Sequence, residues 1–369
     1  MAARQPPTEI FINGRFLSQS VTGVQRYAGE LVKALDLLVA AGDVPAALSN
    51  VSFTLLTPPN AIASLPLKAI GQRQIGTRQG HAWDQVDLAW AARKGGLVSL
   101  SNSGPVLHRR HFIILHDAQV YRHPEFFSRS YLTLHRTLGR LYARLAHLGT
   151  VSAFSRAELS QALNLPAERF SVIPNSAEHI GRTIPDQGIL QRLGVTSGSF
   201  FLAVGSMNRN KNIALAIEAA RLLARPDYPL VVVGGGNHQV FGGTGGAEMG
   251  GAIMAGRLSD EEVAGLYQHA TAFVFPSLYE GFGVPPLEAM TFGCPVLAST
   301  AEAVVETCGD AARYFDPHDA AALSKLMAER IDGQPPLAEL QARQNARIAL
   351  YSWERSAKKL LDALSRMDA

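Results

Sequence analysis

The sequence has only two cysteines, Cys294 and Cys308, among its 369 residues, and no apolar run of membrane-spanning length. So few thiols, with no secretory signal before the first predicted strand, indicate a reducing, cytoplasmic compartment. Cys294 lies in a Gly-Cys-Pro turn, where a small buried side chain is a simpler interpretation than a reactive thiol. Because a spanning helix needs about 20 apolar residues, the chain is not expected to cross a membrane.

Two motifs of nucleotide chemistry are also missing. There is no Asp-x-Asp triplet, so a divalent metal bridging a diphosphate is not expected, and neither is any other cofactor. The first strand leads into Asn-Gly-Arg-Phe-Leu-Ser instead of G-x-G-x-x-G, which argues against a Rossmann-type oxidoreductase. The glycine-rich run 240–251 lacks P-loop or dinucleotide spacing and is predicted to be a loop.

Charge is distributed unevenly along the chain. Residues 1–190 hold 19 Lys and Arg against 12 Asp and Glu, whereas the remainder holds 15 against 19. The first half is therefore expected to face an anionic partner, such as a lipid surface or a pyrophosphate-linked acceptor. The alternative is that these arginines only solvate helix faces. No nucleic-acid partner is expected.

The same two alternatives apply to residues 128–148, which form a predicted amphipathic basic helix. One face is apolar, with Tyr131, Leu134, Leu138, Leu141, Tyr142 and Leu145. The arginines fall largely on another face, with Arg129, Arg136, Arg140 and Arg144. Such a helix either rests on anionic lipid or packs its stripe on a core with a solvated back, and the second interpretation is the commoner one.

Strands alternate with helices in two successive sets, in a chain too long for one ordinary core. The first set has predicted strands at 9–13, 51–57, 97–100, 112–115, 150–152 and 170–173. Residues 174–188 are rich in turn formers and are predicted to be a linker. The second set has strands at 200–204, 230–233 and 252–255, and two more within 273–299. This pattern predicts an α/β fold of two doubly wound, Rossmann-like domains facing a central cleft.

Turns after predicted strands carry side chains suited to a ligand. His116 and Asp117 end the strand at 112–115, where they can orient a sugar and modulate a proton. The alternative is a histidine that caps a turn beside an aspartate helix N-cap. Gly23, just before a predicted helix, lets a backbone approach a ligand closely. Arg209 and Lys211 project from the turn after 200–204, at a helix N-terminus that favours phosphate; a solvated loop is the alternative.

The stretch 273–299 is the most informative. It is predicted to form a strand, a glycine- and proline-rich turn with Glu280, a helix with Glu288, and a second strand. Ionised carboxylates accept several hydrogen bonds, so this pair suits the hydroxyls of a sugar or a ribose.

Taken together, these motifs resemble the retaining glycosyltransferases of family four, the large group-one class with the GT-B fold. The resemblance covers about 11–364 and is strongest in the second half. The matching runs are V-G-S-x4-K-N at 204–212, G-R-L-S-D-E-E at 256–262 and F-P-S-L-Y-E-G-F-G-V-P-P-L-E-A-M at 275–290, preceded by T-G-V-Q-R-Y at 22–27, I-L-H-D at 114–117 and V-S-A-F-S-R at 151–156. It implies an acceptor-side domain at 1–178, on which helix 352–369 packs, and a nucleotide-sugar domain at 186–350.

The resemblance also implies a role for each matching residue. Lys211 would bind the donor diphosphate. Many relatives have an arginine five residues earlier, where this chain has Ser206, and Arg209 is the candidate substitute. Glu280 would contact the transferred sugar, and His116 would lie near that sugar from the first domain.

Further positions complete the implied substrate-binding set. Glu288 would bind the ribose hydroxyls, and Glu306 would lie near the nucleotide, although the usual preceding proline is Val305 here. Gly23 would let the first loop approach the diphosphate or acceptor, and Asp117 follows His116. The remaining members are Gly281, Phe282, Gly283 and Val284, where backbone N–H groups of 281–283 would hold the hydroxyls of the sugar.

The implied activity is transfer of a hexose, such as mannose or glucose, from a nucleotide diphosphate sugar to a glycan or lipid-linked acceptor, with retention. The resemblance also implies a role in surface polysaccharide or lipopolysaccharide synthesis, at the inner face of the membrane. Stabilising the diphosphate leaving group is then the main catalytic task. A GT-B sugar phosphorylase, an epimerase and a non-catalytic sugar-binding assembly partner are the alternatives.

Overall fold

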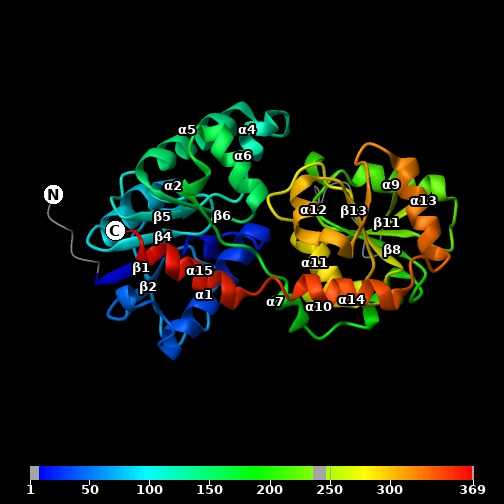
Figure 1. Ribbon diagram of the computed structural model, residues 1–369, viewed down its shortest axis with the longest axis horizontal. Coiled ribbons are helices and arrows are strands. Elements are labelled where there is room, and N and C mark those ends of the chain that lie inside the picture. The colour runs from blue at the N-terminus through cyan, green and yellow to red at the C-terminus, as the bar shows by residue number, and fades with distance from the viewer. Residues whose placement is uncertain (1–7, 236–246, 250, 368–369) are drawn as a thin grey trace. The chain divides into compact units, whose positions relative to one another are not determined.

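The computed structural model describes residues 8–235, 247–249 and 251–367, which form two compact units (Figure 1). Unit 1 runs up to Asn175 and resumes at Ser352, and unit 2 runs from Ser176 to Tyr351. Over the described ranges, no helix combines the length and the apolar character needed to cross a membrane. Most of the run 240–251 lies outside the described residues, but 247–249 form a strand, so the loop prediction is wrong there.

Unit 1 holds a seven-stranded parallel sheet in the order β3-β2-β1-β4-β5-β6-β7. Its strands are β1 (Glu9–Asn13), β2 (Ser52–Thr57), β3 (Gly71–Gln74), β4 (Gly96–Ser99), β5 (His111–Ile114), β6 (His147–Thr150) and β7 (Phe170–Val172). The order reverses between β1 and β4, which is the doubly wound arrangement predicted.

The helices of unit 1 connect these strands. They are α1 (Gly23–Ala41), α2 (Gly80–Ala82), the π-helical η3 (Trp83–Leu88), α3 (Ala89–Ala92), α4 (Gln119–Arg122), α5 (Arg129–Leu145), α6 (Ala153–Leu163) and α15 (Trp353–Ser365), with 3-10 turns η1 (Arg15–Ser18), η2 (Ala46–Leu48), η4 (Pro124–Phe126) and η5 (Ala167–Arg169). The terminal helix α15 packs along α1, so the end of the chain returns to the first unit (Figure 1).

Unit 2 holds a second seven-stranded sheet, in the order β10-β11-β9-β8-β12-β13-β14, antiparallel only at β10. Its strands are β8 (Phe201–Val204), β9 (Leu230–Val233), β10 (Ala247–Met249), β11 (Ala252–Gly256), β12 (Ala272–Phe275), β13 (Val296–Ser299) and β14 (Arg313–Phe315). Here the order reverses between β8 and β12, and ligands of open α/β sheets bind at such a reversal.

The helices of unit 2 cover both faces of this sheet. They are α7 (Glu178–Gly181), α8 (Gly188–Leu193), α9 (Ile213–Leu223), α10 (Asp260–His269), α11 (Val284–Thr291), α12 (Glu302–Cys308), α13 (Ala320–Ile331) and α14 (Leu337–Ile348), with 3-10 turns η6 (Arg209–Lys211) and η7 (Gly309–Ala311). The core lies between α9, α13 and the sheet, and includes Phe201, Val232 and Leu323. Ser259 and Glu262 form a capping box at the start of α10.

Several local predictions need correction. The predicted helix 128–148 ends at Leu145, because β6 begins at His147 and not at 150. The sequence favours Ser155 as the N-cap of the helix that follows 150–152, but the N-cap of α6 is Ser152, whose Oγ accepts from the backbone N–H of Ser155 at 2.9 Å. The predicted linker 174–188 contains α7.

The apolar stripe of α5 is core-facing only in part. Tyr142 is buried, whereas Tyr131, Leu134 and Leu145 are 43%, 42% and 46% exposed. The packed-stripe interpretation therefore fails for the N-terminal half of the helix and for its last turn.

Candidate functional site

The candidate site lies at the strand-order reversal of unit 2. Lys211 comes from η6, which follows β8, and Glu280 comes from the turn after β12. The Lys211 Nζ donates to Glu280 Oε1 at 2.6 Å, with side chains that are 23% and 13% exposed. Neighbouring parallel strands end at the same sheet edge, so residues 69 positions apart meet there.

Asn212 fixes the position of Lys211. Its φ of +52° places the backbone in the left-handed region, which asparagine tolerates better than most residues. Its side-chain Nδ2 donates to the carbonyl of Pro276 at 3.2 Å and to that of Pro317 at 2.7 Å. One amide therefore ties three loops together, and the preceding lysine is held at their junction.

Two glycines border Lys211. A Cβ on Gly234, whose φ is +144°, would lie 1.9 Å from the carbonyl oxygen of Gly205. A Cβ on Gly205 would meet the Lys211 side chain at 3.6 Å. The ends of β8 and β9 approach each other this closely only because Gly234 lacks a side chain.

Glu288, on α11, is held by two protein donors. Its Oε1 bonds to the His179 Nε2 at 2.9 Å, and its Oε2 accepts from the Tyr267 hydroxyl at 3.2 Å. Burial, together with the nearby Glu288 carboxylate, raises the pKa of Tyr267 well above its usual value, so this hydroxyl remains a donor. The Glu288 side chain is 14% exposed, which leaves it accessible.

Sequence reasoning missed His179 and Tyr267. His179 lies on α7, inside the predicted linker, and its Nδ1 is buried with no hydrogen-bond partner among the described residues. Tyr267 lies on α10, where its aromatic ring fits an ordinary core position. The indication that was available is chemical: a buried carboxylate such as that of Glu288 needs hydrogen-bond donors nearby.

The turn before α11 is anchored through its backbone. Gly283 precedes the helix with a φ of +94°, and the Thr307 hydroxyl donates to the carbonyl of Phe282 at 2.6 Å. Phe282 and Gly283 are buried, whereas Gly281 and Val284 are partly exposed, so the binding of a sugar by the backbone of 281–284 stays a prediction. Glu306 lies on α12 one residue before Thr307, where its backbone carbonyl accepts from Arg347.

The turn between β8 and η6 contains the other predicted phosphate ligands. Arg209 is exposed and Ser206 is half-buried. Arg209 therefore has the accessibility that a substitute for the missing arginine needs, and that substitution stays a prediction.

The predicted residues of the first domain all lie in unit 1. His116 is buried, its Nε2 donates to the Leu100 carbonyl at 2.9 Å, and its ring contacts the Tyr27 ring edge-on at 4.8 Å. Burial lowers the pKa of His116 to about 4, so the imidazole is neutral at physiological pH. A buried, neutral imidazole bonded to a backbone carbonyl does not favour proton exchange, and a role of His116 beside a sugar stays a prediction.

Asp117 and Gly23 occupy more open positions. The Asp117 Oδ1 accepts from the backbone N–H of Gln119 at 2.8 Å, and the N-cap of α4 is Ala118, so Asp117 is not that cap. Gly23 is the exposed first residue of α1, and a Cβ there would meet no other atom within 4 Å. Packing therefore does not require a glycine at position 23.

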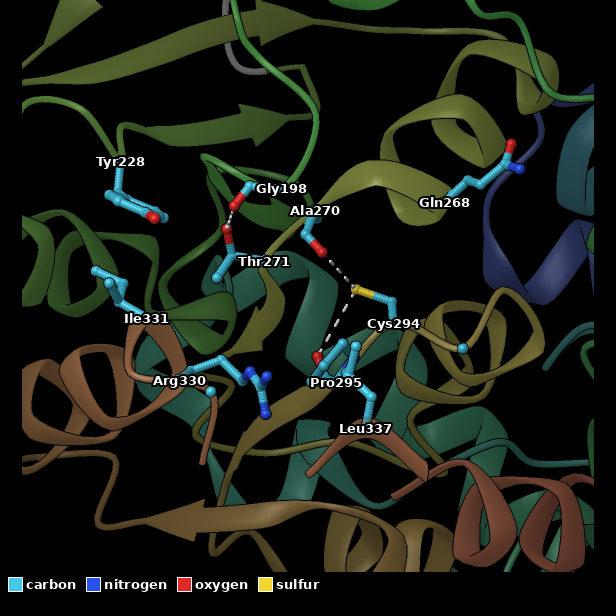
Figure 2. Close-up of a pocket in the computed structure, with 12 residues that line it drawn as sticks. Gly198, Tyr228, Gln268, Ala270, Thr271, Cys294, Pro295, Arg330, Ile331 and Leu337 are labelled. Carbon is cyan, nitrogen blue, oxygen red and sulfur yellow. Dashed lines mark hydrogen bonds between the residues drawn. The ribbon is translucent and has the colours of Figure 1, made fainter. Parts of the chain in front are cut away.

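A cavity of about 300 Å³ lies elsewhere in unit 2 (Figure 2). Its lining includes Thr271 and Pro295, which immediately precede β12 and β13, so it opens at the amino edge of the sheet, opposite the candidate site. Figure 2 shows the Cys294 sulfur directed at the carbonyls of Ala270 and Pro295. Burial raises the pKa of Cys294 to about 12, which confirms the expected buried, unreactive thiol.

Comparisons with known proteins agree with the predicted family. The family described as "Glycosyl transferases group 1" matches residues 191–348. O-antigen chain mannosyltransferase B of Escherichia coli is 31% identical over 263 residues, 67% of this chain and 68% of that protein. O-antigen chain mannosyltransferase RfbU of Salmonella typhimurium is 25% identical over 365 residues, 94% of this chain and 96% of that protein.

A solved structure shows the fold. WaaG, a glycosyltransferase involved in lipopolysaccharide biosynthesis, superposes with a TM-score of 0.69 at 17% identity, over 96% of this chain and 98% of that one. The predicted GT-B fold of two Rossmann-like domains is thereby confirmed.

Proposed function

The chain belongs to the group 1 glycosyltransferases, and from this premise we propose that it transfers mannose, with retention, from a nucleotide diphosphate sugar to a surface-polysaccharide glycan. The two O-antigen relatives are mannosyltransferases, which supports mannose as the sugar and a surface glycan as the product. The single observation that carries the catalytic part is the Lys211–Glu280 pair at the strand-order reversal.

In the proposed reaction, the bond between the anomeric carbon and the diphosphate oxygen breaks. A new bond forms from that carbon to an acceptor hydroxyl, and the hydroxyl proton leaves with the diphosphate. Lys211 balances the charge that grows on the diphosphate, because an ammonium in a partly desolvated site acts strongly on a nearby anion. Glu280 accepts hydrogen bonds from hydroxyls of the sugar.

In the absence of donor, Lys211 and Glu280 neutralise each other. A lysine ammonium has three N–H donors, so it can keep its bond to Glu280 while it binds a phosphate oxygen. Because Lys211 supplies the positive charge, we propose that transfer needs no divalent metal. Equal rates with EDTA and with added Mg²⁺ would support this, and loss of activity in EDTA that Mg²⁺ restores would contradict it.

The test of the function uses Lys211→Ala and Glu280→Gln. A thermal-shift panel of UDP-, GDP-, ADP- and dTDP-sugars first identifies the donor, since a ligand at about 100 times its dissociation constant adds about 2.7 kcal/mol of stability. Both variants should then lose most mannosyl transfer while remaining folded. Arg221→Ala is the matched control, because Arg221 is an exposed cation on α9 that pairs with Glu218 at 2.6 Å. Full transfer in either site variant would refute the proposal.

The assay also separates the alternative activities. Turnover that requires inorganic phosphate would indicate a phosphorylase, and isomerised donor without an acceptor product would indicate an epimerase. Donor binding without any turnover would indicate a non-catalytic partner. The anomeric configuration of the product, read by NMR, tests retention.

We further propose that the acceptor is lipid-linked and that α5 rests on the cytoplasmic face of an anionic membrane. Leu134 and Leu145 are exposed, and the arginines at 129, 140 and 144 are exposed on the same helix. Arg136 is different, because its Nε donates to the Val120 carbonyl at 2.7 Å. Co-sedimentation with phosphatidylglycerol vesicles should fall in Arg140→Glu and with added salt; unchanged binding would contradict the proposal.

A further inference from the structure

Unit 1 has a polar cluster at the reversal of its own sheet, between β1 and β4. Asn13 ends β1 and Ser99 ends β4, and the Asn13 Nδ2 lies 3.3 Å from the Ser99 Oγ. The same Nδ2 donates to Asp84 Oδ1 at 3.2 Å. This is the position where an open parallel sheet binds a ligand, and none of these three residues belongs to the predicted site.

The π-helical segment Trp83–Leu88 places Asp84 in this cluster. Asp84 is fully buried, and its Oδ2 accepts from the Ser103 hydroxyl at 2.6 Å and lies 3.0 Å from the Arg15 Nε. The buried charge is therefore paired and hydrogen-bonded, as a stable buried carboxylate must be. Single π-helical turns occur frequently at functional sites. The cluster forms a rigid base at the carboxyl edge of the sheet.

A row of rings stands beside this base. Tyr131 and His135 lie in the first two turns of α5, and Phe127 precedes the N-cap of this helix, so the three follow one another at four-residue intervals. Their ring centroids are 5.1 Å apart for the first pair and 4.0 Å for the second. The ring of His81, three residues before Asp84, lies 6.1 Å from the ring of His135. We call Phe127, Tyr131, His135 and His81 the ring wall.

The topology places the ring wall at the ligand-binding edge. Since α5 leads into the parallel strand β6, it runs opposite to the strands, and its first turns lie at their carboxyl ends. Farther along the same stripe Tyr142 is buried, whereas Tyr131 is 43% exposed. The outward rings are thus a continuation of a packing stripe beyond the core.

The chemistry of the ring wall is neutral and amphipathic. Burial lowers the pKa of His81 and of His135, with Arg15 as a further cause for both, so both imidazoles are neutral at physiological pH. Burial raises the pKa of Tyr131, with the charge of Asp117 as a further cause, so its phenol stays protonated. Neutral rings offer apolar contact, and their polar atoms donate and accept hydrogen bonds with little loss of side-chain entropy.

We propose that the ring wall is the subsite that binds the terminal sugar of the acceptor glycan. A pyranose ring has an apolar face and a rim of hydroxyls, which match the ring carbons of the wall and its imidazole and phenol groups. A phosphate would need free cations, and Arg15 is already paired with Asp84. Identification of this sugar as the acceptor rests on the proposed function, whereas carbohydrate binding at the ring wall does not.

The first experiment measures binding without donor. Saturation-transfer NMR of the full chain with α-mannobiose should show binding, and Tyr131→Ala should weaken it about tenfold, or about 1.4 kcal/mol. His135→Ala is a second variant that should weaken binding too. Thr137→Ala is the matched control, because Thr137 is exposed on the same helix outside the wall. No binding by the wild type, or equal binding by Tyr131→Ala, would overturn the proposal.

The second experiment measures transfer. Tyr131→Ala should raise the KM for the acceptor about tenfold with the donor KM unchanged. Normal turnover with an unchanged acceptor KM would overturn the subsite and leave the proposed function intact. Mannobiose binding without any turnover would support the subsite and refute the proposed function. If Tyr131→Ala instead lowers only vesicle binding, the wall contacts lipid and the subsite assignment is wrong.

Discussion

His116 should remain neutral far below neutral pH, and acidification should therefore destabilise unit 1. The imidazole is buried, donates from Nε2 to the Leu100 carbonyl at 2.9 Å and packs against Tyr27. Burial lowers the pKa of His116 from 6.5 to about 4, because the cationic form loses its hydration inside the fold. In the unfolded chain the same group titrates at its ordinary value.

The sign and size of the effect follow from these two values. Between pH 6.5 and 4 the unfolded chain binds more protons at this position than the folded chain, so stability falls as pH falls. Above pH 6.5 both states are neutral and the group contributes nothing. The full difference corresponds to about 3.4 kcal/mol, of which about 2 kcal/mol is lost by pH 5. His111, whose pKa burial lowers to about 3, should add a similar loss.

Urea unfolding at pH 7.5 and pH 5.0 tests this reasoning. The three tryptophans, Trp83, Trp90 and Trp353, all lie in unit 1, so their fluorescence reports unfolding of that unit. His116→Gln retains a donor for Leu100 but cannot titrate, and it should lose about 2 kcal/mol less than the wild type between the two pH values. His111→Gln is a second test variant and should show a similar reduction. If His116→Gln and the wild type depend equally on pH, the imidazole is not held neutral and the argument fails.

Three further substitutions test the construction of unit 2. Gly234→Ala should lower the stability of unit 2 by about 1–3 kcal/mol and abolish the donor-dependent thermal shift. The reason is that the new Cβ would meet the Gly205 carbonyl at 1.9 Å, in a backbone region that only glycine adopts easily. An unchanged melting temperature would contradict this. Tyr267→Phe should lower the free energy of unfolding by about 1 kcal/mol and weaken nucleotide binding, since Glu288 loses one of its two donors. The nucleotide-dependent thermal shift measures the second effect. An unaltered shift would show that Tyr267 takes no part in donor binding. Ser259→Ala should cost about 1 kcal/mol in thermal unfolding through the lost helix cap and leave the transfer rate unchanged; a slower rate would mean that α10 takes part in the site.

Periodic and local signals explain how much of the fold was predictable. Alternation of buried strands with amphipathic helices predicts both doubly wound sheets, and the Ser259 cap is a local motif that reads directly from sequence. Strand β3 was missed because Gly71–Gln74 is exposed throughout and shows no apolar alternation. The π-helical turn at Trp83–Leu88 reads as an ordinary helix, because the extra residue leaves the local composition unchanged.

The contact between Lys211 and Glu280 was predictable, because the topology of the sheet brings the two residues together. Each follows a strand, and β8 and β12 are neighbours in any doubly wound sheet of this order. The role of each side chain came from the family resemblance, since periodicity says nothing about which ligand a lysine faces.

The environment of Glu288 was not predictable from the sequence, because it depends on a contact between residues 109 positions apart. Helix α7 has four residues, too few to show a period, and it begins at the third residue of unit 2. His179 and Tyr267 each take one oxygen of Glu288, yet each oxygen has a second lone pair that a ribose hydroxyl can use. The two donors therefore fix the direction of the carboxylate, and in the proposed site this lowers the entropy that ribose binding must overcome. A segment that composition assigns to a linker thus orients the predicted ribose ligand.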